Sequence, residues 1–126
     1  GGQKRPNIHI DDMTDLYVQS LEWPHAKVHK RVFNAGYENH TVDQLANMVR
    51  EEVGNQVTIK TVSTDDNRSY HVSSERIQRE LGFKPTHTIA DAIRDLTNAF
   101  KAGKIPDSMS NSRYYNIKRM QEVNLE

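Results

Sequence analysis

The chain has 126 residues, which is enough for one compact domain and too few for two ordinary ones. Lys plus Arg number 17 and Asp plus Glu also number 17, and this zero net charge argues against a nucleic-acid groove or an anionic membrane surface as the main partner. The sequence has no cysteine, which excludes disulfides and thiolate metal sites, and it has no apolar run long enough to span a bilayer.

The first predicted element is a strand over residues 7–11, where apolar and polar side chains alternate. Arg5 and Pro6 lie directly before it. Asp12 is expected to accept a hydrogen bond from the free N–H groups that open a helix over residues 13–22. The chain therefore begins as a strand followed by a helix.

A second strand is predicted over residues 31–37, "RVFNAGY", which is a short apolar run that ends in a glycine turn. Thr41 and Gln44 then form a capping-box pattern for a helix over residues 42–53. Gly54 is a natural C-terminal stop for this helix. These signals predict a second strand and helix.

A third, half-buried strand is predicted over residues 56–62, "QVTIKTV", because its side chains alternate. Ser73 or Ser74 is expected to cap a short helix through Leu81, closed by Gly82. This part of the chain again combines an extended segment with a helix.

Thr88 with Asp91 opens the last clear helix, predicted over residues 89–102, and the tail from residue 104 onward is expected to be extended and partly ordered. The alternation of strands and helices favours an α/β domain. Because the strands are few and short, a full doubly wound sheet cannot be built from this chain alone.

Four stretches, in this order and spacing, resemble a known family: "GGQKRPNIHIDDMTDLY", "FNAGYENHTVDQLANMV", "DNRSYHVSSERIQRELGFKP" and "TIADAIRDL". Together they resemble the C-terminal, substrate-binding part of the extended short-chain dehydrogenase/reductases, the NAD-dependent nucleotide-sugar epimerases and dehydratases. The resemblance implies a small mixed α/β lobe over residues 1–105, without the Rossmann half, followed by a tail over residues 106–126. It implies that the chain is a fragment of a longer, cytoplasmic enzyme.

The resemblance also implies a set of substrate-binding residues. Arg5 matches the arginine that contacts the diphosphate of the nucleotide sugar, which suits a guanidinium that can bind two phosphate oxygens at once. Asn7 stands where relatives often carry an aromatic residue. Asp66 matches an aspartate that holds the nucleotide, and Arg68 is a candidate for the positive charge that relatives place before it. Asp65, Asp66 and Arg68 are equally compatible with a solvated turn.

The catalytic and cofactor-binding motifs of the family are missing from this sequence. There is no glycine-rich dinucleotide loop, and Tyr114 and Lys118 follow the arginine strand, whereas the catalytic pair of the family precedes it. We therefore expect no catalytic residue and no cofactor in this chain, while NAD or NADP is implied for the intact enzyme. His25 and His29 have helical spacing, but no helix is expected there, so no metal site is predicted.

The expected partners are a nucleotide-diphosphate sugar and the missing Rossmann half. In relatives the strand that corresponds to residues 31–37 completes the sheet of that half. An exposed strand edge recruits other strands, so a homo-oligomer through this edge, or through another normally covered face, is expected. The alternative function is a free-standing small-ligand or protein-interaction module derived from the same lobe.

Overall fold

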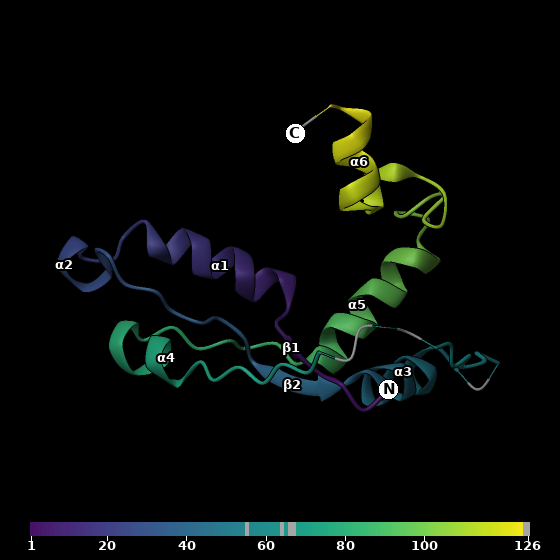
Figure 1. The fold of residues 1–126 in the computed structure, drawn as a ribbon, viewed down its shortest axis with the longest axis horizontal. Helices are drawn as coiled ribbons and strands as arrows, with labels where there is room; N and C mark the ends of the chain where they lie inside the picture. The colour runs from purple at the N-terminus through teal and green to yellow at the C-terminus, as the bar shows by residue number, and fades with distance from the viewer. Residues whose placement is uncertain (55, 64, 66–67, 125–126) are drawn as a thin grey trace. The chain divides into compact units, whose positions relative to one another are not determined.

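The computed structural model describes residues 1–54, 56–63, 65 and 68–124 (Figure 1). The chain divides into two compact units, Gly1–Asp95 and Leu96–Glu126. The elements follow in the order β1 (Lys4–Asn7), α1 (Ile10–Ser20), α2 (His25–Val28), β2 (Glu38–Thr41), α3 (Val42–Val53), α4 (Glu75–Leu81), α5 (Ile89–Lys101), η1 (Ser112–Tyr114) and α6 (Asn116–Glu122). The described part is thus a small α/β structure, as expected from the sequence.

The sheet consists of β1 and β2, which pair antiparallel. In this register Arg5 lies opposite His40, so the two side chains share one face of the sheet. The chain around Ser69 and Tyr70 runs along β1: the Tyr70 N–H donates to the Lys4 carbonyl oxygen at 3.0 Å, and the Lys4 N–H donates to Ser69 Oγ at 3.0 Å. β1 is therefore flanked on both sides.

Asn39 joins β2 to the segment that follows Tyr70. Its side-chain amide donates to the Val72 carbonyl oxygen at 3.0 Å and accepts from the Val72 N–H at 2.9 Å. Asn39 lies opposite Pro6 in the sheet, and proline has no N–H to donate to a neighbouring strand. The side chain of Asn39 thus satisfies the backbone groups of Val72 beside the one residue of β1 that cannot donate.

The predicted strand over residues 7–11 is wrong, because the strand lies earlier and Ile10 already begins α1. The cap is His9, whose Nδ1 accepts from the Asp11 N–H at 3.1 Å. Asp12 therefore does not cap this helix; it lies in the first turn, and its side chain is buried.

Two other strand predictions are also wrong, because no strand is present over residues 31–37 or 56–62, all of which are described. β1 takes its partner from β2, directly after the first of these segments, and only the Tyr37 N–H bonds to β1, donating to the Asn7 carbonyl oxygen at 2.8 Å. Alternation of side chains indicates a strand only where a partner is within reach.

Short helices appear where none were expected. α2 forms around His25, and its ring lies 4.4 Å from that of His29 between centroids. The tail, expected to be extended, contains η1 and α6. Among the described residues no helix is both long and apolar enough to cross a membrane.

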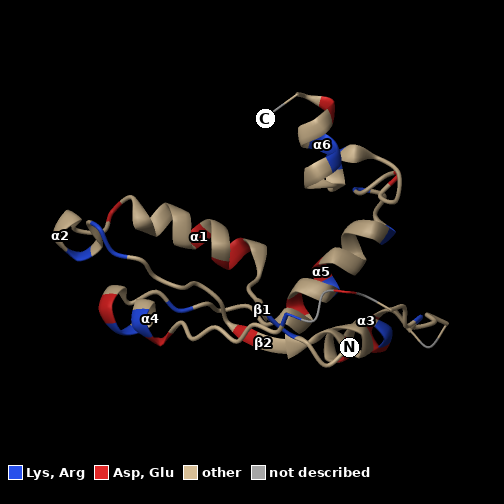
Figure 2. Ribbon diagram, in the orientation of Figure 1, with Lys and Arg blue, Asp and Glu red and all other residues tan. Residues whose placement is uncertain are grey.

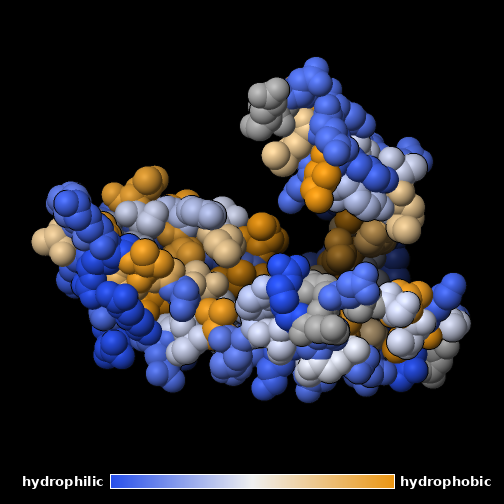
Figure 3. All heavy atoms as spheres, viewed as in Figure 1, coloured by the Kyte–Doolittle hydropathy of each residue, from blue (hydrophilic) through white to orange (hydrophobic). Residues whose placement is uncertain are grey.

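The apolar core of the first unit is small. Among its described residues, four hydrophobic side chains are buried: Leu16, Ile77, Phe83 and Ile89. Partly buried side chains around this core include Met13, Trp23 and Phe33. Many other large apolar side chains are exposed, and Figure 3 shows several of them in orange beside the charged residues of Figure 2.

Candidate functional site

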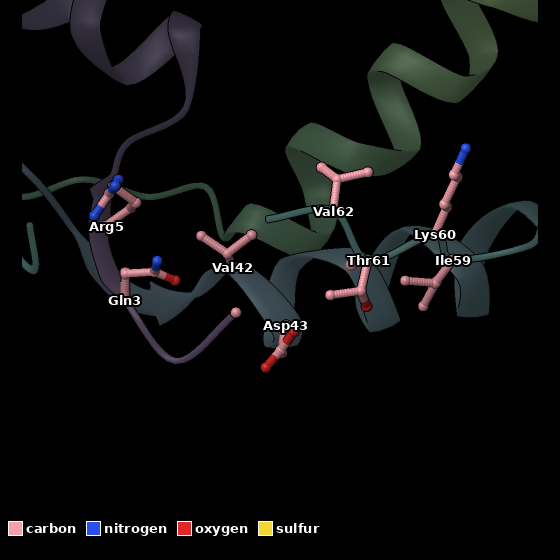
Figure 4. A pocket seen from close by; sticks show the side chains of 10 residues that line it. Gln3, Arg5, Val42, Asp43, Ile59, Lys60, Thr61 and Val62 are labelled. Atoms are coloured by element: carbon pink, nitrogen blue, oxygen red, sulfur yellow. The ribbon is translucent and has the colours of Figure 1, made fainter. Parts of the chain in front are cut away.

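A cavity of about 290 Å³ lies beside β1 and the N-terminal end of α3. It is lined by Gly1, Gln3, Arg5, Val42, Asp43, Ala46, Ile59, Lys60, Thr61 and Val62. In Figure 4 Arg5 and Lys60 lie at opposite ends, with Val42 and Val62 between them. The cavity thus has the guanidinium of Arg5 at one end, an apolar middle, and the carboxylate of Asp43 in its wall, while the exposed Lys60 side chain at the other end extends away from the other labelled side chains.

Arg5 is held in place from two directions. Its Nη1 donates to the carbonyl oxygen of Lys4 at 3.0 Å and to that of Arg68 at 2.6 Å. The guanidinium carbon lies 5.7 Å from the centroid of the Tyr70 ring, within the range of a cation–π interaction. These contacts restrict the rotational freedom of the Arg5 side chain.

The other predicted site residues are not gathered in the same way. Asn7 donates from Nδ2 to the Arg5 carbonyl oxygen at 2.6 Å, and it does not line the cavity. Arg68 contributes its backbone carbonyl to Arg5, while its own side chain is exposed. The prediction for Asp66 falls outside the described residues. The structure therefore brings together Arg5 and the backbone of Arg68.

The sequence interpretation missed the cavity residues that come from the segment 59–62. The alternation over residues 56–62 places Ile59 and Thr61 on one face of the predicted strand and Lys60 on the other. In the structure these side chains line the same cavity as Arg5. The alternation of side chains within the segment does not predict that the segment lies beside α3, because that position depends on the tertiary structure.

A second polar cluster surrounds the carboxylate of Asp12, which is 2% exposed. It accepts from the backbone N–H groups of Thr86 at 3.0 Å and His87 at 2.9 Å, and it contacts Thr86 Oγ1 at 3.1 Å and His87 Nδ1 at 3.0 Å. Burial alone raises the pKa of Asp12, but these hydrogen bonds outweigh it and lower the pKa to about 2. Asp12 thus ties the first turn of α1 to the chain just before α5.

His9 and His87 stack beside this carboxylate, with ring centroids 4.7 Å apart. His9 is 2% exposed, and its Nε2 lies 3.5 Å from Asp95 Oδ2. His9, Asp11 and Asp95 each place one ligand atom within 4.8 Å of the others, a spacing that could hold a metal ion.

The hydrogen bonds of His9 argue against a metal at this group. Its Nδ1 accepts from the Asp11 N–H, so in the neutral ring Nε2 carries the proton and faces Asp95. A metal at Nε2 would require the proton to move to Nδ1, which would break the helix cap. The cluster is better suited to hydrogen bonding than to metal binding.

Comparison with models of known protein families finds none that matches this chain. The described part is, in class, a small α/β unit with a two-stranded antiparallel sheet and a cavity beside it. A curated UDP-glucose 4-epimerase from Corynebacterium glutamicum is 34% identical over 91 residues, which cover 70% of this chain and 27% of the epimerase. The chain therefore contains a region related to part of an epimerase, and it spans about a quarter of that protein's length.

Proposed function

We propose that residues 1–105 are the nucleotide-sugar-binding lobe of a cytoplasmic, NAD(P)-dependent nucleotide-sugar epimerase or dehydratase of the extended short-chain dehydrogenase/reductase type. The observation that carries this proposal is the place of Arg5 at one end of a cavity with an apolar middle. The relationship of this region to part of an epimerase supports it. The lobe binds the nucleotide and does not catalyse the reaction alone.

The cavity has the chemistry that a nucleotide diphosphate needs. Arg5 provides charge-assisted hydrogen bonds to phosphate oxygens, each worth about 1.5–3 kcal/mol. Val42, Ile59 and Val62 offer apolar surface to a nucleobase and ribose. Because the Lys60 side chain extends away from the other side chains that Figure 4 labels, the diphosphate binds at the Arg5 end.

The residues of this chain are assigned no step of the chemistry. The sequence contains no glycine-rich loop for a dinucleotide. Tyr114 ends η1 and Lys118 lies in α6, both in the second unit, and Lys118 Nζ lies 4.4 Å from the ring of Tyr115. NAD or NADP, which supplies the transient oxidation, therefore belongs to another part of the enzyme.

The proposal is tested by calorimetric titration of UDP-glucose and dTDP-glucose into the chain and its Arg5→Ala variant. Loss of one charge-assisted contact of about 1.5–3 kcal/mol predicts an affinity lower by roughly 10- to 100-fold. Free glucose is expected to give no heat, because the cavity contacts are to the nucleotide.

Arg79→Ala is the matched control, since Arg79 lies on α4 with a side chain that is 68% exposed and does not line the cavity. It should bind as the wild type does. Equal affinity of wild type and Arg5→Ala, or no heat with either nucleotide sugar, would contradict the proposal.

A free-standing protein-interaction module is the second candidate. It is favoured by the apolar side chains that α1 exposes, such as Leu21 at 86% and Ile10 at 71%. Such side chains are typical of surfaces that bind another protein when they form a contiguous patch. A chain that binds no nucleotide but associates through α1 would support this candidate.

A further inference from the structure

One face of α1 is apolar and exposed. Asp12 and Leu16 turn into the core, whereas Ile10, Tyr17 and Leu21 are 71%, 68% and 86% exposed. With Thr14 between them, these three residues follow the 4–3–4 spacing that places side chains along one stripe of a helix. We call Ile10, Thr14, Tyr17 and Leu21 the α1 stripe. Val18, at 58% exposed, widens it.

The charges around the α1 stripe are separated along the helix. Asp11 in the first turn and Asp15 in the next are exposed, whereas Asp12 is buried and bonded to Thr86 and His87, and the last turn contains no basic residue. α2, which follows, carries His25 and Lys27. Figure 2 shows red in the first half of α1, a further red segment between α1 and α2, and blue at α2. The acidic residues lie at the N-terminal end of α1, where the helix dipole is positive, so the dipole stabilises their negative charges there.

We propose that the α1 stripe is a self-association surface, on which α1 of a second copy packs antiparallel to form a two-fold symmetric dimer. In this arrangement Ile10 of each copy lies near Leu21 of the other, with the aromatic ring of Tyr17 at the centre. The same stripe is used by both copies, which is the requirement of a two-fold interface.

The charge pattern favours this occupant and this direction. Antiparallel packing brings the acidic first turn of each helix toward the basic α2 of its partner, whereas parallel packing places the acidic turns side by side. Glu22, in the turn between α1 and α2, carries the opposite charge to the basic residues of this region, and Lys27 and Lys30 offset it.

A short helix provides a small interface, so the dimer is weak and reversible. The α1 stripe contains none of the residues that line the Arg5 cavity. The inference is therefore independent of nucleotide binding, and failure of one does not imply failure of the other.

The test is sedimentation velocity of the 126-residue chain from micromolar to millimolar concentration. The wild type is expected to shift from monomer to dimer, and Leu21→Lys is expected to remain monomeric. Because Leu21 is 86% exposed, this substitution should leave the fold intact, which circular dichroism checks. Met109→Lys is the control: it adds the same charge at a residue that is 84% exposed in the second unit, and it should dimerise as the wild type does.

Direction is tested by charge reversal at the two ends. Asp11→Lys and Lys27→Glu should each weaken the dimer, and the double variant should regain affinity, because both contacts are then reversed together. A wild-type chain that is monomeric throughout would overturn the proposal. So would Leu21→Lys dimerising as well as wild type, or a double variant no stronger than the weaker single variant.

Discussion

The role of Asp12 in the folded chain differs from the role that the sequence predicts. Its place before an apolar helix predicts a capping side chain. In the structure His9 is the cap, and Asp12 is 2% exposed and bonded to Thr86 and His87, more than seventy residues away in the sequence. Thr86 and His87 make four contacts to the Asp12 carboxylate, and these contacts hold their segment against the first turn of α1.

At this residue we predict a pH dependence of stability. The pKa of Asp12 is lowered from 3.8 to about 2 in the folded chain, so the unfolded chain binds more protons as pH falls. The stabilisation is complete above about pH 4 and is lost as the pH falls toward 2. At 1.36 kcal/mol per pKa unit it amounts to about 2 kcal/mol. Urea unfolding between these pH values measures it, and Asp12→Asn should flatten the acid limb.

His87 makes stability depend on pH in the opposite direction, so that stability falls as the pH rises. Its hydrogen bond to Asp12 raises its pKa above 6.5, although partial burial acts against this, so its contribution is present below the unfolded pKa and is lost as the pH rises through the folded value. NMR titration of His87 should show the raised pKa, and the shift should disappear in Asp12→Asn. A profile unchanged by that substitution would disprove the role of this pair.

At the scale of single elements, α3 was predicted with the correct ends because its signals are local. The Thr41 Oγ1 accepts from the Gln44 N–H at 3.1 Å, and Gln44 Oε1 accepts from the Thr41 N–H at 2.8 Å. The helix runs over Val42–Val53, and Gly54 follows it, as expected. These bonds join residues three apart, so no distant part of the chain is needed to form them.

Removing this cap should weaken the structure by a small, measurable amount. Thr41→Ala leaves the Gln44 N–H without its partner and should lower the free energy of unfolding by about 1 kcal/mol. Thr41→Ser keeps an acceptor oxygen and should restore most of the stability. Denaturant unfolding measures both variants, and a Thr41→Ser variant as unstable as Thr41→Ala would show that the cap is not the cause.

The other helix ends follow the same rule. Gly82 ends α4 with φ of 76°, a left-handed conformation that glycine adopts without strain. At the start of α4 Ser74 occupies the cap position, but the side chain that accepts is that of Ser73, from the Glu75 N–H at 3.3 Å.

For α5, Thr88 Oγ1 accepts from the Asp91 N–H at 3.2 Å and Asp91 Oδ2 accepts from the Thr88 N–H at 2.9 Å, which confirms the predicted start of this helix.

At the scale of the whole chain, the balance of buried and exposed apolar side chains is unusual. Leu16, Ile77, Phe83 and Ile89 are buried, while exposed large hydrophobics are spread over α1, α3, α5 and α6. A domain of this length normally buries most of its apolar side chains. This exposure supports the proposal that the lobe works with another polypeptide surface.

The division of the chain predicts that the tail is dispensable for binding. Every residue that lines the Arg5 cavity lies between residues 1 and 62, and the buried apolar core of the first unit ends at Ile89. A chain ending at residue 105 should therefore bind UDP-glucose with the affinity of the full chain, as measured by calorimetry. Its circular dichroism spectrum should show that α3 and α5 remain. Loss of binding in a chain that keeps its helices would show that the tail contributes to the site.

The α/β class and the starts and ends of α3, α4 and α5, to within about a residue, follow from the amino-acid sequence alone, because capping signals are local features. Arg5 is a candidate for binding only through the resemblance of four sequence stretches to a known family. Three features are visible only in the folded chain: β2 is the partner of β1, residues 59–62 line the cavity with Arg5, and Asp12 is buried. The physical reason is that strand pairing, cavities and buried hydrogen bonds join residues that are far apart in the chain. A local sequence pattern therefore does not predict which of these distant residues come into contact.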